Sequence, residues 1–165
     1  MKAPTRFMKV SWDNIEKDCI ILYDKIQKNF KFDCIVAICR GGRIPARIIS
    51  DLSGVRNVGN LRVESYDVFH KGEARITQDI SIDVKTQNVL LVDDIADTGD
   101  SLMLAKNYLL KKFPKNLMTA TLHYKVTSKI RPDFFAEETD TDAWIIYPWE
   151  KRETLRKLKE KWIEI

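Results

Sequence analysis

Carboxylates and hydroxyls gather in one short stretch near the middle of the chain. Asp93, Asp94 and Asp97 come directly after an apolar run, residues 88–92, and the polar turn 98–101 follows them. Like charges this close repel one another unless hydroxyls, a metal ion or a developing positive charge offsets them. The turn, Thr-Gly-Asp-Ser, offers hydroxyls, a glycine and the start of a helix, which are the parts of a phosphate-binding site. The stretch therefore predicts a site for a sugar phosphate, with the sugar hydroxyls facing Asp93 and Asp94.

Strands and helices are expected to alternate along the chain and to position this stretch. Apolar residues at helical spacing follow Ser11 as an N-cap, and Pro45 and Gly54 bracket a second helix. We expect helices over residues 11–30, 45–54, 101–113 and 150–162, and strands over residues 33–39, 58–66, 88–92, 117–124 and 143–147. This alternation predicts an α/β fold with a parallel sheet covered on both faces, whose ligands bind beyond the carboxyl ends of the strands.

Length and composition limit the class of protein. The 165 residues are 44% hydrophobic and 32% charged, which predicts one globular domain over residues 1–165. No apolar run approaches the ~18 residues of a membrane span, and residues 1–12 lack the apolar core of a signal peptide, so we expect a cytoplasmic protein. Cys19, Cys34 and Cys39 lack the spacing of a disulfide framework or a zinc site and are expected to be buried thiols. The net charge of +4 suits an enzyme of polyanionic phosphates and does not argue for nucleic acid.

Residues 89–102, VLLVDDIADTGDSL, resemble the signature that binds 5-phosphoribosyl-1-pyrophosphate (PRPP) in type I phosphoribosyltransferases. The match runs through four apolar residues, two acids, two further apolar residues and then D-T-G-x-S/T. The resemblance implies a Rossmann-like α/β fold with a parallel sheet and a small hood that binds the base. It also implies an enzyme that moves the phosphoribosyl group from PRPP to a base, with Mg²⁺ as cofactor, and releases pyrophosphate and a nucleoside monophosphate.

The resemblance also assigns roles to single residues. Asp93 and Asp94 are expected to bind the ribose hydroxyls and to place the Mg²⁺ ion. Asp97 is expected to face N7 of a purine as the catalytic proton acceptor or donor. Asp100 stands where some relatives have lysine or glycine, so its side chain is expected to point outward and leave its backbone amide as the ligand. The 5′-phosphate is expected at Ala96, Asp97, Thr98, Gly99, Asp100 and Ser101.

The segment Cys39-Arg40-Gly41-Gly42 resembles the family's pyrophosphate-binding turn, so Arg40 and Gly41 are expected to bind PRPP. Taken alone, such a segment is more often a plain β-to-α turn. In several purine relatives the peptide before the basic residue is cis without a proline, and we look for this bond between Cys39 and Arg40.

The polar segment 67–87 lacks clear periodicity and predicts a long excursion from the fold. It lies where the family has a mobile lid, and Ser65-Tyr66 resembles the start of that lid. A lid would exclude water from a reactive sugar cation. An ordinary hairpin is the alternative.

The last third of the chain is expected to choose the base. The segment 144–150, WIIYPWE, resembles the W-I-x-x-P-W-D/E of xanthine-guanine phosphoribosyltransferases. The resemblance implies that Trp144 stacks on the purine, that the backbone of Ile145 meets its 2-position edge, and that Lys125 donates to its 6-oxo group. Because a 6-oxo group accepts hydrogen bonds, a lysine discriminates against the amino group of adenine. The prediction is purine salvage of guanine, xanthine or hypoxanthine by a homodimer or homotetramer.

Two alternatives stay open on the sequence. The first is a phosphoribosyltransferase that uses adenine or a pyrimidine, against which Lys125 and Trp144 argue. The second is a PRPP-sensing regulatory protein of the same fold that binds RNA or DNA, which should have a dominant basic face. Basic and acidic residues are interleaved in the segment 150–162, and the chain retains Asp94 and Asp97, which favours catalysis.

Overall fold

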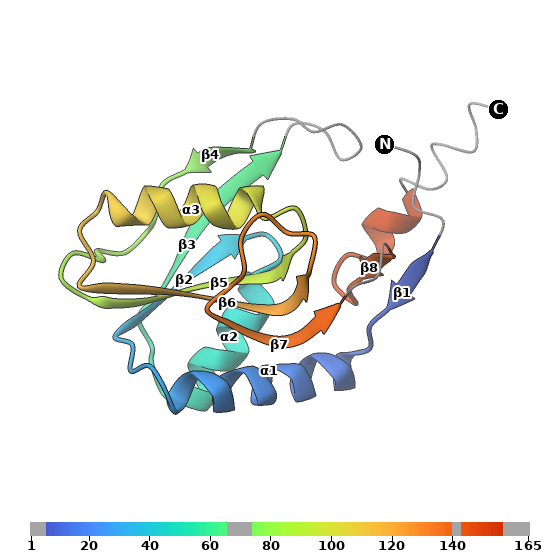
Figure 1. Cartoon of the computed structure of the whole chain (residues 1–165), viewed down its shortest axis with the longest axis horizontal. Helices are drawn as coiled ribbons and strands as arrows, with labels where there is room; N and C mark the ends of the chain where they lie inside the picture. Colours follow the sequence, from blue (N-terminus) through green and yellow to red (C-terminus); the bar gives the residue numbers. More distant parts are fainter. Residues whose placement is uncertain (1–5, 66–73, 140–142, 157–165) are drawn as a thin grey trace.

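A six-stranded sheet forms the centre of the protein (Figure 1). The computed structural model describes residues 6–65, 74–139 and 143–156. The strands of this sheet lie in the order β4-β3-β2-β5-β6-β7, and each neighbouring pair is parallel except β3 with β4. The elements are β1 (Phe7–Lys9), α1 (Trp12–Gln27), β2 (Cys34–Cys39), α2 (Arg43–Ser53), β3 (Val58–Ser65), β4 (Ala74–Gln78), β5 (Asn88–Ala96), α3 (Asp100–Leu110), β6 (Asn116–Lys125), β7 (Phe134–Thr139) and β8 (Trp144–Ile146). Residues 151–156 are also helical. The predicted α/β fold is confirmed, and the sheet is parallel as predicted except for its antiparallel edge strand β4.

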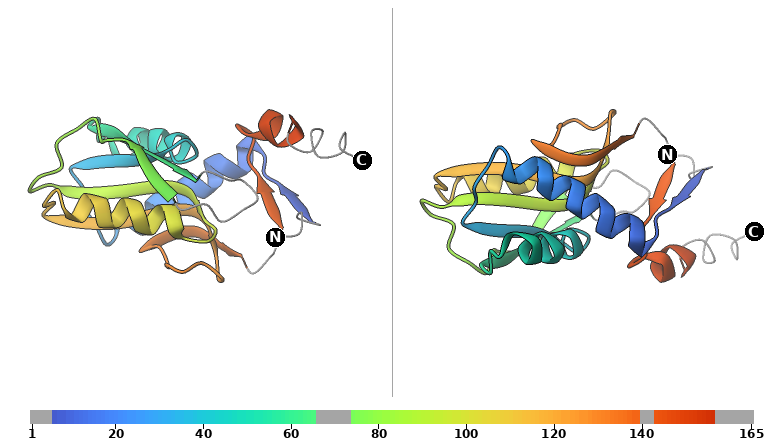
Figure 2. Two further views of the ribbon diagram at one scale, coloured as in Figure 1. Left: turned by 90° about the horizontal axis from the view of Figure 1, so that it is seen from above. Right: turned by 90° about the horizontal axis from the view of Figure 1, so that it is seen from below.

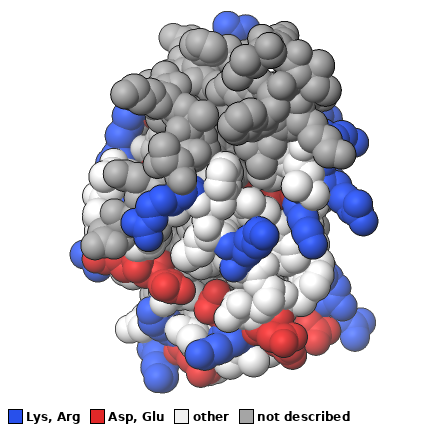
Figure 3. Space-filling model, turned by 90° about the vertical axis from the view of Figure 1, so that its right-hand side faces the viewer, with Lys and Arg blue, Asp and Glu red and all other residues white. Residues whose placement is uncertain are grey.

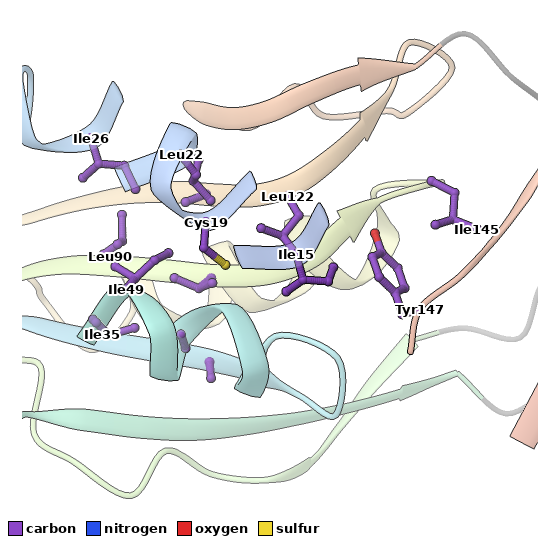
Figure 4. Packing of buried hydrophobic residues seen from close by; sticks show 14 residues of the cluster. Ile15, Cys19, Leu22, Ile26, Ile35, Ile49, Leu90, Leu122, Ile145 and Tyr147 are labelled. Carbon is purple, nitrogen blue, oxygen red and sulfur yellow. The ribbon is translucent and has the colours of Figure 1, made fainter. Parts of the chain in front are cut away.

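Helices cover both faces of this sheet. α1 and α2 lie on one face and α3 lies on the other, as the two views of Figure 2 show. The strands are apolar on both sides for this reason: in β2, Ile35 and Ala37 pack under α1 and α2, whereas Val36 and Ile38 pack under α3. Figure 4 shows the first of these clusters, in which the buried side of α1 faces the sheet.

The expected capping signals mark the ends of the helices. Ser11 is the N-cap of α1, where its hydroxyl accepts a bond from the amide of Asn14 at 3.1 Å and its own amide donates to the Asn14 side chain at 3.2 Å. Gly54 ends α2 with a φ of 74°, a left-handed conformation that glycine adopts without penalty. The three cysteines are buried and free, as predicted.

β5 is longer than the sequence predicts, and this changes where the acids lie. The expected strand ends at residue 92, whereas β5 continues to Ala96. It continues because β6 runs alongside it and places Thr121 opposite Asp93. Asp93 and Asp94 therefore lie on the strand itself, and the turn begins after it.

Part of the expected excursion is regular structure. Residues 74–78 form β4, antiparallel to β3, where the sequence predicted no strand. Three apolar residues at alternate positions follow: Ile80 and Ile82 pack against the cluster under α3, and Val84 is 1% exposed. In the sequence, the alternation of these apolar residues was the signal that this part of the excursion packs against the core. Of the proposed lid start, Ser65 is the last residue of β3, whereas Tyr66 and residues 67–73 lie outside the described residues.

Two short strands form a second sheet beyond the carboxyl ends of the central strands (Figure 1). β1 pairs with β8 in parallel, with Phe7 opposite Trp144 and Met8 opposite Ile145. The sequence predicts β8 from the apolar segment 143–147. It predicts neither β1, which is only three residues long and includes Lys9, nor β7, whose residues are only partly apolar. Within the described ranges, none of the helices is long and apolar enough to cross a membrane.

Candidate active site

Three strand ends meet at one edge of the central sheet. β2, β5 and β6 are neighbouring parallel strands, so their carboxyl ends face the same side, toward β1 and β8 (Figure 1). β2 ends at the turn that contains Arg40 and Gly41, β5 ends at the turn 97–101, and β6 ends at Lys125. The fold thus brings together three segments that are far apart in the sequence.

Asp93, which is buried, and Asp94, which is partly exposed, form a carboxyl pair near the end of β5. Asp93 is 8% exposed, and its carboxylate accepts a bond from the amide of Asp94 at 2.9 Å. Burial raises the pKa of Asp93 well above its usual value, and the charge of Asp94 raises it further. Burial also raises the pKa of Asp94 to about 6, although a hydrogen bond from Asp93 lowers it in part. A divalent cation would stabilise both carboxylates as anions, and carboxylate oxygens are ligands that Mg²⁺ prefers, so the pair fits Mg²⁺.

The turn after β2 lies directly against this pair. A β-carbon at Gly41 would overlap the carboxylate of Asp94, so only glycine lets the turn approach the acid this closely. The peptide bond between Cys39 and Arg40 is cis. The guanidinium of Arg40 lies at the surface, where its Nη2 is 2.6 Å from Oε2 of Glu153.

The turn between β5 and α3 has the geometry of an anion site. Gly99 has a φ of 86°, and a β-carbon there would lie 2.6 Å from Oγ of Ser128 and 3.1 Å from the backbone nitrogen of Ile130. The hydroxyl of Thr98 accepts a bond from the amide of Asp100 at 3.3 Å, which leaves its own proton to donate. Because α3 begins at Asp100, the positive end of the helix faces the turn.

The remaining residues of this turn differ in what they can offer a phosphate. The carboxylate of Asp100 points to Lys129, with Oδ1 2.6 Å from Nζ, while its backbone amide already donates to Thr98. Ala96 is 1% exposed at the end of β5, so only its backbone is available. Ser101 is partly exposed in the first turn of α3.

Lys125 and Asp97 form an ion pair at the ends of adjacent strands. Nζ of Lys125 lies 2.9 Å from Oδ1 of Asp97. The pair follows from the register of the sheet, because Ala96 lies opposite Tyr124 and each strand then presents its next residue at the same edge. The side chain of Lys125 is 11% exposed and that of Asp97 is 45% exposed, so the pair opens to solvent on the acid's side.

Trp144 and Ile145 come from the second sheet. The amide of Trp144 donates to the carbonyl of Arg6 at 2.9 Å, and the carbonyl of Ile146 accepts from the amide of Val10 at 3.1 Å, so both groups face β1. Since successive residues of a strand face alternate sides, the amide and carbonyl of Ile145 face away from β1. Its side chain is buried in the core. The indole Nε1 of Trp144 is buried and has no hydrogen-bond partner among the described residues.

The sequence did not single out Tyr147, which connects the second sheet to the acids. Its hydroxyl donates to the backbone carbonyl of Asp94 at 3.1 Å and lies 2.8 Å from Nδ1 of His123. Its ring stacks on Trp149, with centroids 4.7 Å apart and planes 7° apart. Figure 4 shows Tyr147 toward one end of the core cluster. No sequence signal distinguishes this tyrosine from a core aromatic, because the partners of its hydroxyl lie on other strands.

The chain and its fold have counterparts among known proteins. Residues 11–153 match the family model of the phosphoribosyl transferase domain. A xanthine-guanine phosphoribosyltransferase from Desulfotalea psychrophila is 32% identical over 146 residues, which cover 88% of this chain and 87% of that protein.

Solved structures with the same fold include two purine enzymes. A purine phosphoribosyltransferase from Pyrococcus horikoshii superposes with a TM-score of 0.79 at 29% identity, over 89% of this chain and 95% of that one. A xanthine-guanine-hypoxanthine phosphoribosyltransferase from Helicobacter pylori superposes with a TM-score of 0.78 at 25% identity, over 94% and 99% of the two chains.

Proposed function

Because this chain belongs to the phosphoribosyl transferase family, we propose that it transfers the phosphoribosyl group of PRPP to a 6-oxopurine. The products are a nucleoside monophosphate and pyrophosphate, and the bases are guanine, xanthine or hypoxanthine. The observation that supports this choice of base most directly is the pair of Lys125 and Asp97, whose Nζ and Oδ1 lie 2.9 Å apart.

This pair matches one edge of a 6-oxopurine. The 6-oxo group and N7 lie side by side on that edge, and the oxygen is an acceptor. The ammonium of Lys125 donates to the oxygen, while Asp97 accepts or returns the proton at N7. Adenine presents an amino group in place of the oxygen, so Lys125 would face a donor and the complex would lose a hydrogen bond.

The second sheet completes the base site. Trp144 supplies an aromatic face, and aromatic rings stack on purines with little regard to their substituents. The backbone groups of Ile145 that face away from β1 are available to the 2-position edge, where guanine has an amino group and xanthine an oxygen. An amide and a carbonyl side by side provide one donor and one acceptor, so this edge admits more than one 6-oxopurine.

PRPP is assigned to the acids and the turns. Asp93 and Asp94 hold the ribose hydroxyls, the turn 97–101 holds the 5′-phosphate, and Arg40 with the Gly41 turn holds the pyrophosphate. Mg²⁺, when bound at Asp93 and Asp94, would neutralise the pyrophosphate charge. The anomeric carbon becomes positively charged in the transition state, as in glycoside hydrolysis, and Arg40 stabilises the negative charge that develops on the leaving group.

Arg40 must change partner for this role. In the structure its guanidinium pairs with Glu153, on residues 151–156. Both side chains are at least partly exposed, at 73% and 25%, so the pair contributes little and a pyrophosphate can displace the carboxylate.

Steady-state assays with PRPP, Mg²⁺ and six bases test the proposal. Turnover with guanine, xanthine or hypoxanthine and little with adenine, orotate or uracil is the expected result. Preference for one of the latter three would support the first alternative. PRPP binding without turnover of any base would support the regulatory protein. Such a protein should have a dominant basic face, whereas basic and acidic side chains are interspersed on the face shown in Figure 3.

A further inference from the structure

His123, a buried residue of β6, lies beside acidic residues of α1 and β7 and has no part in the proposed reaction. The side chain of His123 is 2% exposed. Its Nε2 lies 3.9 Å from Oδ2 of Asp18, on α1, and 3.8 Å from Oε2 of Glu137, on β7. The side chain of Asp18 is 12% exposed and that of Glu137 is 60% exposed, so the group is open to solvent on one side only.

The hydrogen bonds of the ring determine which nitrogen carries the proton. The hydroxyl of Tyr147 donates its one proton to the carbonyl of Asp94, so it can only accept from Nδ1 of His123. Nδ1 therefore carries the hydrogen of the neutral ring, and Nε2 presents a lone pair. Nε2 thus faces two carboxylates without a hydrogen-bond donor between them in the part of the chain that the structure describes.

Protonation of Nε2 would not give the ring a hydrogen bond to either carboxylate. The distances of 3.8 Å and 3.9 Å are too long for hydrogen bonds from Nε2 to either carboxylate. Burial also lowers the pKa of His123, and Glu137 offsets this only in part. Burial therefore favours the neutral form of the ring.

A metal ion fits the same positions. The three ligand atoms lie within 4.8 Å of one another. Zinc binds imidazole nitrogen and carboxylate oxygen at about 2.0 to 2.2 Å, so two ligands of one ion are roughly 3 to 4 Å apart. Modest rotation of the exposed Glu137 side chain would bring the atoms to this spacing.

We propose that Asp18, His123 and Glu137 bind one transition-metal ion of the zinc type, separate from the Mg²⁺ expected at Asp93 and Asp94. An imidazole ligand favours zinc and its neighbours over Mg²⁺ and Ca²⁺. Nδ1 donating to a buried oxygen is the usual arrangement of a metal-bound histidine, because it fixes the tautomer and the orientation of the ring. The ion would link α1, β6 and β7 and, through Tyr147, support the backbone at Asp94.

Zinc binding to the full chain tests this site. The protein is first stripped with a chelator and then titrated with Zn²⁺ in excess Mg²⁺, so that the carboxylates of Asp93 and Asp94 are occupied. Wild type should bind one Zn²⁺ per chain and unfold at a higher temperature when it is bound. Glu137→Gln should bind Zn²⁺ more weakly by about 10-fold to 100-fold or more, because loss of even an outer partner of a metal ligand costs this much affinity.

Glu138→Gln is the matched control. Glu138 is also on β7, but its carboxylate pairs with Arg131, with Oε2 3.8 Å from Nη2, and is not one of the proposed ligands. This variant should bind zinc like wild type. Since Glu137 is largely exposed, its replacement should fold, and circular dichroism checks this. Equal zinc affinity in Glu137→Gln and Glu138→Gln, or no zinc bound by wild type, would overturn the proposal. So would a thiolate-to-metal band in the Co²⁺-loaded protein, which would assign the ion to a cysteine.

Discussion

The two halves of the candidate site are built in different ways. The phosphate half, which consists of Arg40-Gly41, Asp93-Asp94 and the turn 97–101, belongs to the neighbouring strands β2 and β5 of the central sheet. The base half, which consists of Lys125, Trp144 and Ile145, joins the end of β6 to β8, and β8 is paired with β1 from the other end of the chain. One half rests on the core of the sheet, and the other depends on two three-residue strands. Changes in one half should therefore leave binding at the other largely intact, and Asp97 lies at their junction.

Replacing Asp97 should separate binding from turnover. Asp97→Asn keeps the shape of the side chain but loses the proton acceptor, so turnover should fall by about 10-fold to 1,000-fold while PRPP affinity stays near that of wild type. Steady-state kinetics and PRPP titration measure the two effects. Asp51→Asn, an exposed acid of α2, is the control and should behave as wild type. Turnover within about 2-fold of wild type would reject Asp97 as the acid-base group.

Gly41→Ala should damage the phosphate half alone. Its β-carbon would displace the carboxylate of Asp94, and a displacement of about 1 Å at a reacting group can cost roughly 100-fold in rate. We expect a loss of this size in kcat/KM for PRPP. Gly54→Ala is a matched control: its φ of 74° strains an alanine, but no atom lies within 4 Å of the new β-carbon, so stability should fall and kinetics should not. If Gly41→Ala also abolished binding of the free base, the phosphate half and the base half would not be independent.

Thr98→Ala should have a smaller effect on the same half. The hydroxyl donates to a charged phosphate that is present in both PRPP and the nucleotide product, so both should bind more weakly by about 1 to 2 kcal/mol. Isothermal titration of each ligand gives the two losses. A change in affinity for the free base only would show that the phosphate lies elsewhere.

The acid pair should also make stability depend on pH in Mg²⁺-free protein. Burial raises the pKa of Asp94 from 3.8 to about 6, so the folded state disfavours its charge. A carboxyl with a raised pKa contributes stability that is fully present below its unfolded value and is lost as the pH rises through about 6. The melting temperature of wild type should therefore fall relative to that of Asp94→Asn between about pH 4 and pH 7, and Mg²⁺ should restore it at pH 7. A difference that is constant across this range would contradict the assignment.

The sequence predicts the phosphate half better than the base half, and the reason is physical. The residues from Asp93 to Ser101 are contiguous, and a buried strand next to an acidic, glycine-containing turn is visible as local pattern. The extension of β5 through its acids is not, because it depends on pairing with β6. The pairing of Phe7 with Trp144 leaves no periodic signal, and the contacts of Tyr147 come from strands far apart in sequence. Lys125 and Trp144 could be identified from the sequence only through a family resemblance. The ion pair of Lys125 with Asp97 and the pairing of Trp144 with Phe7 became visible only in the folded structure.

The central claim is that Lys125 reads the 6-oxo group beside Asp97, and competition between guanine and adenine tests it most directly. Lys125→Met removes a charged donor whose side chain is only 11% exposed. The kcat/KM for guanine should therefore fall by a factor that corresponds to about 1.5 to 3 kcal/mol of transition-state stabilisation. Adenine should lose little, because Trp144 contacts only the face of its ring, and the preference for guanine should narrow. Equal proportional losses for the two bases would mean that Lys125 acts on PRPP or on folding, and would contradict the assignment of the base half.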